Sequence, residues 1–197
     1  MAGVIGVMLY TLLREFLHFV ATRMAGVGSA RLLPAAVRFD NQQQFWALVD
    51  VRDFAAAAQI ASPAGVGWAE LMVPAASVGL TWVAALLIHR QDLRPWAAGI
   101  GLAAPIRLLV PAAYSFLVVL RYVQGQPPHR QPGLAEYGAE LLLGVPAAFL
   151  FLVELVLSVP AVVKIAEACD FRGERIRAIA LAAGLCFGFA VLAAIAA

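Results

Sequence analysis

Three residues in the first apolar segment, Arg14, Glu15 and His18, have types and spacing that could do chemistry. Arg14 and His18 are four residues apart, so a helix places them on one face with Glu15 beside them. This is the frame of the zinc-binding motif H-E-x-x-H, in which two His ligands flank a Glu that acts as general base. The positions of the base and of the second ligand are filled. The first ligand position holds Arg14, whose guanidinium cannot be deprotonated to bind a metal.

The longer run Glu15–Val27, which reads EFxHFxAxRxxGV, resembles the first motif of the site-2 protease family of intramembrane zinc metalloproteases. The resemblance implies that Glu15 is a catalytic base and His18 a zinc ligand. The family's late Asp ligand has no counterpart, because no Asp occurs between Asp92 and Asp170. With the first His and the late Asp both absent, the chain is interpreted as a degenerate member, a pseudoprotease, and no cofactor is expected.

An active zinc protease with unusual ligands is the competing hypothesis. A catalytic zinc needs about three protein ligands and an open position for water. Besides His18, the loop after the third apolar segment offers His129 and Glu136. A ligand set such as His18, His129 and Glu136 could form a zinc site, with Glu15 as base, if that loop folded back among the helices.

The composition is that of an integral membrane protein. Of the 197 residues, 63% are hydrophobic and 13% charged, and the mean hydropathy is +0.86, whereas soluble domains are about half apolar and a quarter charged. The basic residues are scattered, so no nucleic-acid partner is expected. We predict a single all-α membrane domain with five spans of about 20 residues and a small β-hairpin segment at 29–62. The predicted spans are 2–24, 67–88, 96–120, 141–163 and 178–197.

The polar segment between the first two spans predicts a β-hairpin next to the helices. The runs Ala35–Phe39 and Phe45–Val51 are rich in β-branched and aromatic residues, and Asp-Asn-Gln at 40–42 is a turn signal between them. In site-2 proteases a membrane-dipping hairpin at this place presents substrate, so the resemblance implies the same position here. Asp53 is predicted to cap a short helix, Phe54–Ile60.

Six of the ionisable residues within the predicted spans need partners, because a charge at the centre of a bilayer costs roughly 2.5–3.5 kcal/mol on insertion scales. We interpret them as an internal network in which Arg14 pairs with Glu15, Glu70 or Glu154 and Arg107 pairs with another acid. For Arg14 a carboxylate on another span is favoured, because Glu15 is turned by about 100° around the helix. A proton path through Glu154 is the alternative. The network comprises Arg14, Glu15, His18, Glu70, Arg107 and Glu154.

Gly184 and Gly188 in the last span have the spacing of small residues that let helices approach closely. We predict that this face packs against another helix. The two cysteines, Cys169 and Cys186, lack Cys-x-x-Cys spacing and are interpreted as packing residues with free thiols.

These observations favour a non-catalytic, site-2-protease-like protein that acts as a scaffold or accessory subunit of a larger membrane complex. Its expected partners are other membrane proteins, in a hetero-oligomer, and the lipid bilayer. The expected location is a multi-pass position in a bacterial-type inner membrane. An active zinc metalloprotease and a small proton-conducting or transporter subunit are the two alternatives.

Overall fold

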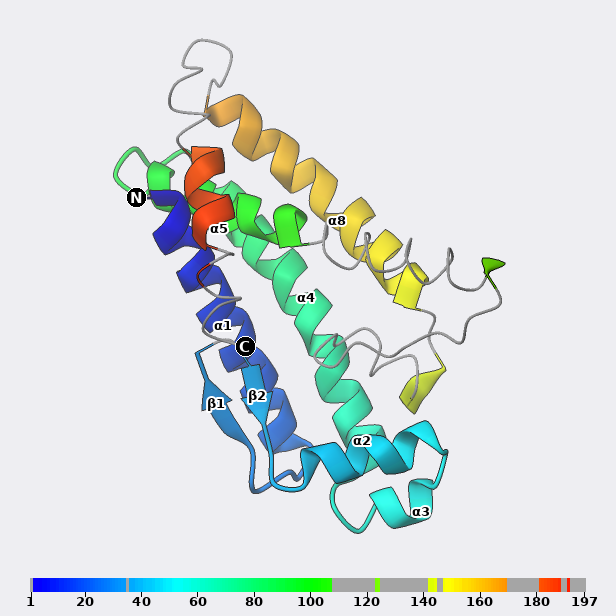
Figure 1. Ribbon diagram of the computed structural model, residues 1–197. Helices are drawn as coiled ribbons and strands as arrows, with labels where there is room; N and C mark the ends of the chain where they lie inside the picture. Colours follow the sequence, from blue (N-terminus) through cyan, green and yellow to red (C-terminus); the bar gives the residue numbers. More distant parts are fainter. Residues whose placement is uncertain are drawn as a thin grey trace.

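The computed structural model describes residues 2–34, 36–107, 123–124, 142–144, 147–169, 181–188 and 191. Within these residues the chain is mostly helical, with one small antiparallel sheet (Figure 1). Three of the described helices are long and apolar enough to cross a membrane, over Gly3–Met24, Pro63–Leu87 and Phe149–Ala168. The chain is therefore a helical membrane protein by length and composition of its helices, and the count of five spans stays a prediction.

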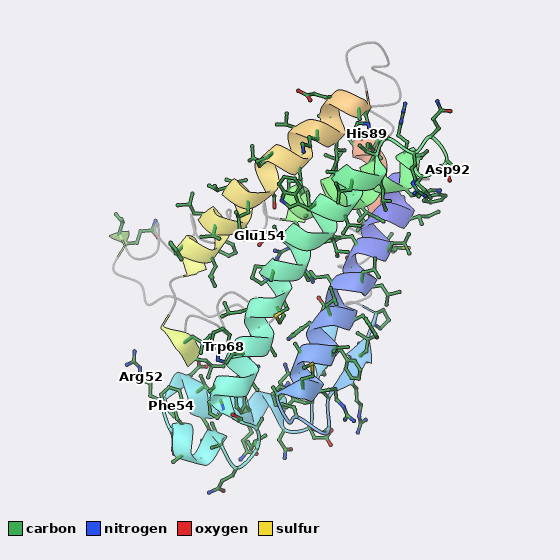
Figure 2. The ribbon with its side chains drawn as sticks, turned by 180° about the vertical axis from the view of Figure 1, so that it is seen from behind. Arg52, Phe54, Trp68, His89, Asp92 and Glu154 are labelled. Carbon is green, nitrogen blue, oxygen red and sulfur yellow. The ribbon has the colours of Figure 1, made fainter. Side chains whose placement is uncertain are left out.

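Helices α1 (Ala2–Met24) and α4 (Pro63–Leu87) lie side by side and form the axis of the molecule (Figure 1). Helix α5 (Arg94–Arg107) packs against both, and α8 (Ala147–Ala168) packs mainly against α4. Helix α4 runs the length of the molecule, with Trp68 near one end and His89 just beyond the other (Figure 2). Polar side chains on the facing sides of these helices are thereby held inside the bundle.

The predicted limits of the first span match those of α1, and the other limits differ. Helix α4 begins at Pro63 rather than at residue 67, because Ser62 caps it: the Ser62 hydroxyl accepts a hydrogen bond from the Gly65 amide at 3.2 Å. Helix α8 covers 147–168 instead of 141–163. The predicted third and fifth spans are described only in part, at 94–107 and at 181–188 and 191.

A hairpin exists in the predicted segment, and the first predicted strand, Ala35–Phe39, contains strand β2 (Ala36–Arg38), but the predicted turn and second strand are wrong. Strand β1 (Arg31–Leu33) pairs antiparallel with β2, with Arg31 opposite Arg38. The predicted second strand is helical, since α2 covers Gln42–Asp50. Its buried residues Phe45 and Val49 are four apart, which is the spacing of one helix face. Burial of that face outweighs the β-propensity of the individual residues.

Helix α3 (Phe54–Ala57) begins where the sequence predicts and ends earlier than the predicted Ile60. The Asp53 carboxylate accepts a hydrogen bond from the Ala56 amide at 3.0 Å, which confirms the predicted cap. The hairpin, α2 and α3 lie together at the end of the molecule where α1 ends and α4 begins (Figure 1). Their shared core also includes the start of α4; its members are Val27, Ala30, Val37, Phe39, Phe45, Val49, Ala57, Ala61 and Val66.

Glycines mediate the closest contacts of α1. A Cβ atom added to Gly184 would lie 3.4 Å from the Gly3 Cα, and one added to Gly188 would lie 3.0 Å from the Val7 Cβ. The prediction that the Gly184 and Gly188 face packs against another helix is therefore confirmed, with α1 as the partner. On another side of α1, a Cβ added to Gly6 would come within 2.5 Å of the Gly99 backbone carbon, so only glycine fits there.

Candidate functional site

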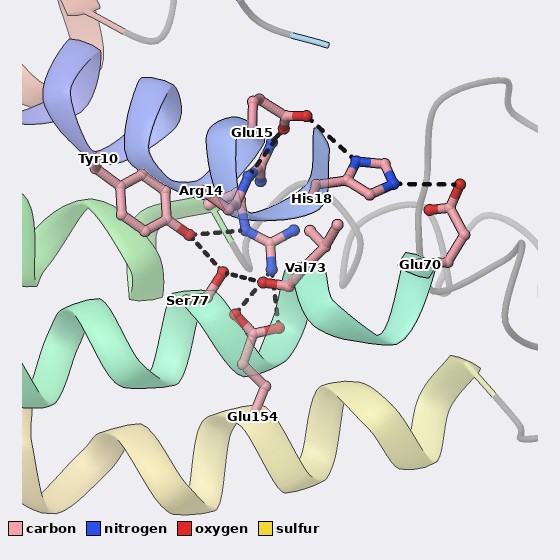
Figure 3. A network of polar contacts seen from close by, with 9 residues as sticks. Tyr10, Arg14, Glu15, His18, Glu70, Val73, Ser77 and Glu154 are labelled. Carbon is pink, nitrogen blue, oxygen red and sulfur yellow. Dashed lines mark hydrogen bonds and ion pairs between the residues drawn. The ribbon is translucent and has the colours of Figure 1, made fainter. Parts of the chain in front are cut away.

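The motif residues of α1 form a compact charged group. Arg14 Nε donates a hydrogen bond to Glu15 Oε1 at 3.0 Å, and Arg14 Nη2 contacts the same oxygen (Figure 3). Both side chains are largely buried. The prediction that Arg14 prefers a carboxylate on another span is wrong. The long Arg side chain bends around the helix and reaches its neighbour, so the 100° offset between the two residues is bridged.

His18 lies between two carboxylates from different helices. Its Nδ1 is 3.5 Å from Glu15 Oε2 on α1, and its Nε2 is 3.8 Å from Glu70 Oε1 on α4 (Figure 3). The second distance is that of an ion pair rather than of a hydrogen bond. Glu15 thus has Arg14 on one oxygen and His18 on the other, so both oxygens of the candidate catalytic base already have partners.

A small, shallow recess adjoins His18 at the end of the bundle where the hairpin lies. Polar groups from α1, α4 and the start of α2 line it together with apolar side chains. The recess is where the motif helix, the hairpin and α4 meet, although they are separated in sequence. Its lining residues are His18, Thr22, Val37, Phe39, Gln42, Val66 and Glu70.

The second buried charge group joins α5 to α8. Arg107 Nη2 lies 2.8 Å from each carboxylate oxygen of Glu154, whose side chain has no exposed surface. Arg107 Nε donates to the Tyr10 hydroxyl at 3.2 Å. That hydroxyl is 2.7 Å from Ser77 Oγ, which donates to the Val73 carbonyl at 3.0 Å. The predicted pairing of Arg107 with an acid is confirmed, and the network connects α1, α4, α5 and α8 (Figure 3).

Two members of this network, Tyr10 and Ser77, were missed by sequence reasoning. Both are fully buried and both use their hydroxyl groups. The sequence signal for both residues is helical periodicity. Tyr10 precedes Arg14 by four residues and Ser77 follows Glu70 by seven, so each lies on the same helix face as a charged residue. A polar residue at helical spacing from a buried charge in a membrane span is thus a candidate member of its network.

The residues proposed for an atypical zinc site are brought together only in part. Glu15 and His18 are adjacent, and Glu70 approaches His18. His129 and Glu136 lie outside the described residues. Within the described parts of the chain, no three His, Cys, Asp or Glu side chains gather as a metal site requires. The expectation of no cofactor and the zinc alternative both stay predictions.

No protein-family model matches the chain, and comparison with curated proteins and with solved structures finds no match either. The resemblance of the α1 motif to that of site-2 proteases therefore stays a prediction. What the chain does has to be inferred from the contacts of its own residues.

Proposed function

We propose that this protein is a non-catalytic, site-2-protease-like membrane protein that acts as a scaffold or accessory subunit of a larger membrane complex. The observation that carries the proposal is the contact between Arg14 and Glu15, with Nε of Arg14 at 3.0 Å from Glu15 Oε1. A cation occupies the place of the first zinc ligand, and it binds the residue that would serve as the base.

The chemistry of zinc hydrolysis conflicts with this contact. The metal lowers the pKa of its bound water to about 7, and a free carboxylate must take the water's proton. Glu15 instead accepts hydrogen bonds from Arg14 and contacts His18. A fixed positive charge also repels a dication: two unit charges 4 Å apart already interact by about 4 kcal/mol at an effective dielectric of 20. The arrangement suits a structural ion group better than a metal centre.

The outer face of α8 supports a role in binding other membrane proteins. Helix α8 buries a narrow seam, Glu154, Ser158, Ala161 and Ile165, against the rest of the chain. Most of its other large apolar residues are exposed, among them Phe149, Leu152 and Val156. These three follow the i, i+3, i+7 spacing of one helix face, which in a bilayer can contact lipid or the helix of a partner.

Zinc content and proteolysis test the non-catalytic part of the proposal. We expect purified protein to hold zinc well below one ion per chain and to leave a transmembrane reporter substrate uncut. His18→Ala should change neither result, and His89→Ala, at the far end of α4, is the matched histidine control. Stoichiometric zinc that disappears in His18→Ala but persists in His89→Ala would overturn the proposal.

Site-specific photocrosslinking in native membranes tests the scaffold part. A photoreactive residue at Leu152 should give a discrete crosslinked band that contains another membrane protein. The same residue at Gln43, exposed on α2, serves as the control position. Crosslinks from position 152 to lipid alone would contradict a role for α8 in holding a partner.

A further inference from the structure

We infer that the corner between α2 and α3, together with Trp68 of α4, is seated in the bilayer surface and binds the phosphate of a phospholipid headgroup through Arg52. We call this set, Val51, Arg52, Phe54 and Trp68, the interfacial corner. The inference concerns a lipid site at the end of the bundle and does not depend on the proposed scaffold role.

The helices fix where the bilayer surface lies. The end of α1 and the start of α4 meet at one end of the molecule, and α2 and α3 lie across that end (Figure 1). Helix α4 has 25 residues, or roughly 37 Å at 1.5 Å per residue, and the hydrocarbon core is about 30 Å thick. The ends of α4 therefore reach the headgroup layers. Trp68, five residues into α4, falls near the boundary at which Trp side chains concentrate.

The interfacial corner exposes large apolar side chains, whereas the outer face of α2 is polar. Val51, Phe54 and Trp68 are 73%, 40% and 65% exposed, respectively. Arg52, Phe54 and Trp68 lie on the same side of the molecule (Figure 2). The exposed residues along α2 itself include Gln43, Gln44 and Asp50. A polar face turned to water and an apolar corner beside a membrane span are the features of an element that lies in the membrane plane.

The backbone at Arg52 indicates that its side chain has a use beyond the fold. The Asp53 amide bonds to the Leu48 carbonyl at 2.9 Å and the Arg52 amide to the Val49 carbonyl at 3.0 Å, which is the Schellman pattern of helix ends. Arg52 occupies the left-handed position of that pattern, at φ 59°, where glycine is usual. The local structure would favour glycine, and the chain places an exposed guanidinium there.

A phospholipid phosphate fits the Arg52 guanidinium. The planar guanidinium offers paired N–H donors that match phosphate oxygens. The neighbouring Asp53 carboxylate is engaged with the backbone as the cap of α3. The apolar side chains of the interfacial corner would enter the boundary of the acyl chains, and the Arg52 guanidinium would lie beside them at the depth of the phosphates. This combination favours a lipid headgroup over a ligand dissolved in water.

Arg52→Gly separates lipid binding from folding, because glycine relieves the left-handed backbone. Phosphatidylglycerol, titrated into detergent-purified protein and counted by native mass spectrometry, is the probe. We expect Arg52→Gly to weaken binding roughly five-fold with thermal stability unchanged or raised. Arg38→Gln, which removes an exposed charge from the hairpin at the same end, should bind as the wild type does. Binding by Arg52→Gly equal to that of the wild type overturns the proposal.

Fluorescence quenching in nanodiscs tests the depth of the corner. The part of the tryptophan emission lost in Trp68→Phe should be quenched most by phosphatidylcholine brominated close to the headgroup. Quenching only by lipid brominated at the bilayer centre would place Trp68 too deep. An absence of quenching would mean that water or protein covers it. Either result overturns the proposal.

Discussion

Glu154→Leu is expected to be among the most destabilising single substitutions in the chain. Arg107 Nη2 lies 2.8 Å from both carboxylate oxygens, and the Glu154 side chain has no exposed surface. At 4 Å and an effective dielectric of 20, two opposite unit charges attract each other by about 4 kcal/mol. Removal of one member of a buried pair costs about 3–5 kcal/mol, because the other charge is left without its partner. We expect a loss of this size in the free energy of unfolding.

A double-mutant cycle isolates the contribution of the pair. Arg107→Leu alone should destabilise the protein to a similar extent, since it leaves the Glu154 carboxylate buried. The double variant should lose far less than the sum of the two single losses, because no uncompensated charge remains. The assay is reversible unfolding in mixed micelles with increasing SDS, followed by far-ultraviolet circular dichroism.

The exposed pair of Arg31 and Asp40 provides the comparison. These side chains are 74% and 63% exposed, with Nη2 and Oδ1 3.4 Å apart, so Arg31→Leu should cost less than about 1 kcal/mol. Additive effects at Arg107 and Glu154 would refute the reasoning. A coupling energy of about 0.6 kcal/mol would also refute it, because that is the average for hydrogen bonds between helices in a membrane protein.

Three further predictions follow from other contacts. Arg14→Ala should lower the free energy of unfolding by about 3–5 kcal/mol in the same unfolding assay. Arg14→His should fold and still leave a transmembrane reporter uncut, and cleavage would contradict the interpretation of the motif as degenerate. Gly6→Ala should lower the free energy of unfolding by about 1–3 kcal/mol through overpacking, whereas Gly79→Ala, where nothing lies within 4 Å, should leave it unchanged or raise it. Equal effects of the two substitutions would contradict the close packing at Gly6. Burial raises the pKa of the Cys169 thiol, so less thiolate is present at a given pH. In a Cys186→Ser background, maleimide labelling of Cys169 should therefore reach half its maximal rate at a higher pH than labelling of a free thiol does. The same pH dependence as that of a free thiol would contradict the burial of Cys169.

Local sequence patterns determined several features of this protein. The limits of α1 follow from a run of apolar residues long enough to span a bilayer. The cap at Asp53 follows from a side chain that reaches a backbone amide three residues on. The glycine pair at 184 and 188 predicts a close helix contact because glycine has no side chain to hold a neighbour away. Each of these depends on interactions within a few residues or on residue size alone.

Only the tertiary structure decided the secondary structure of Phe45–Val51 and the partners of the charges. The β-propensity of that segment is a weak local preference, and burial of Phe45 and Val49 in a core shared with β2, α3 and α4 made it helical. The sequence leaves several carboxylates as possible partners of Arg14, and in the structure Arg14 binds Glu15. The ion pair between Arg107 and Glu154 joins residues that are 47 positions apart in the sequence. Such a contact depends on how whole helices pack, because the sequence reveals that a buried charge needs a partner without specifying which helix brings it within reach.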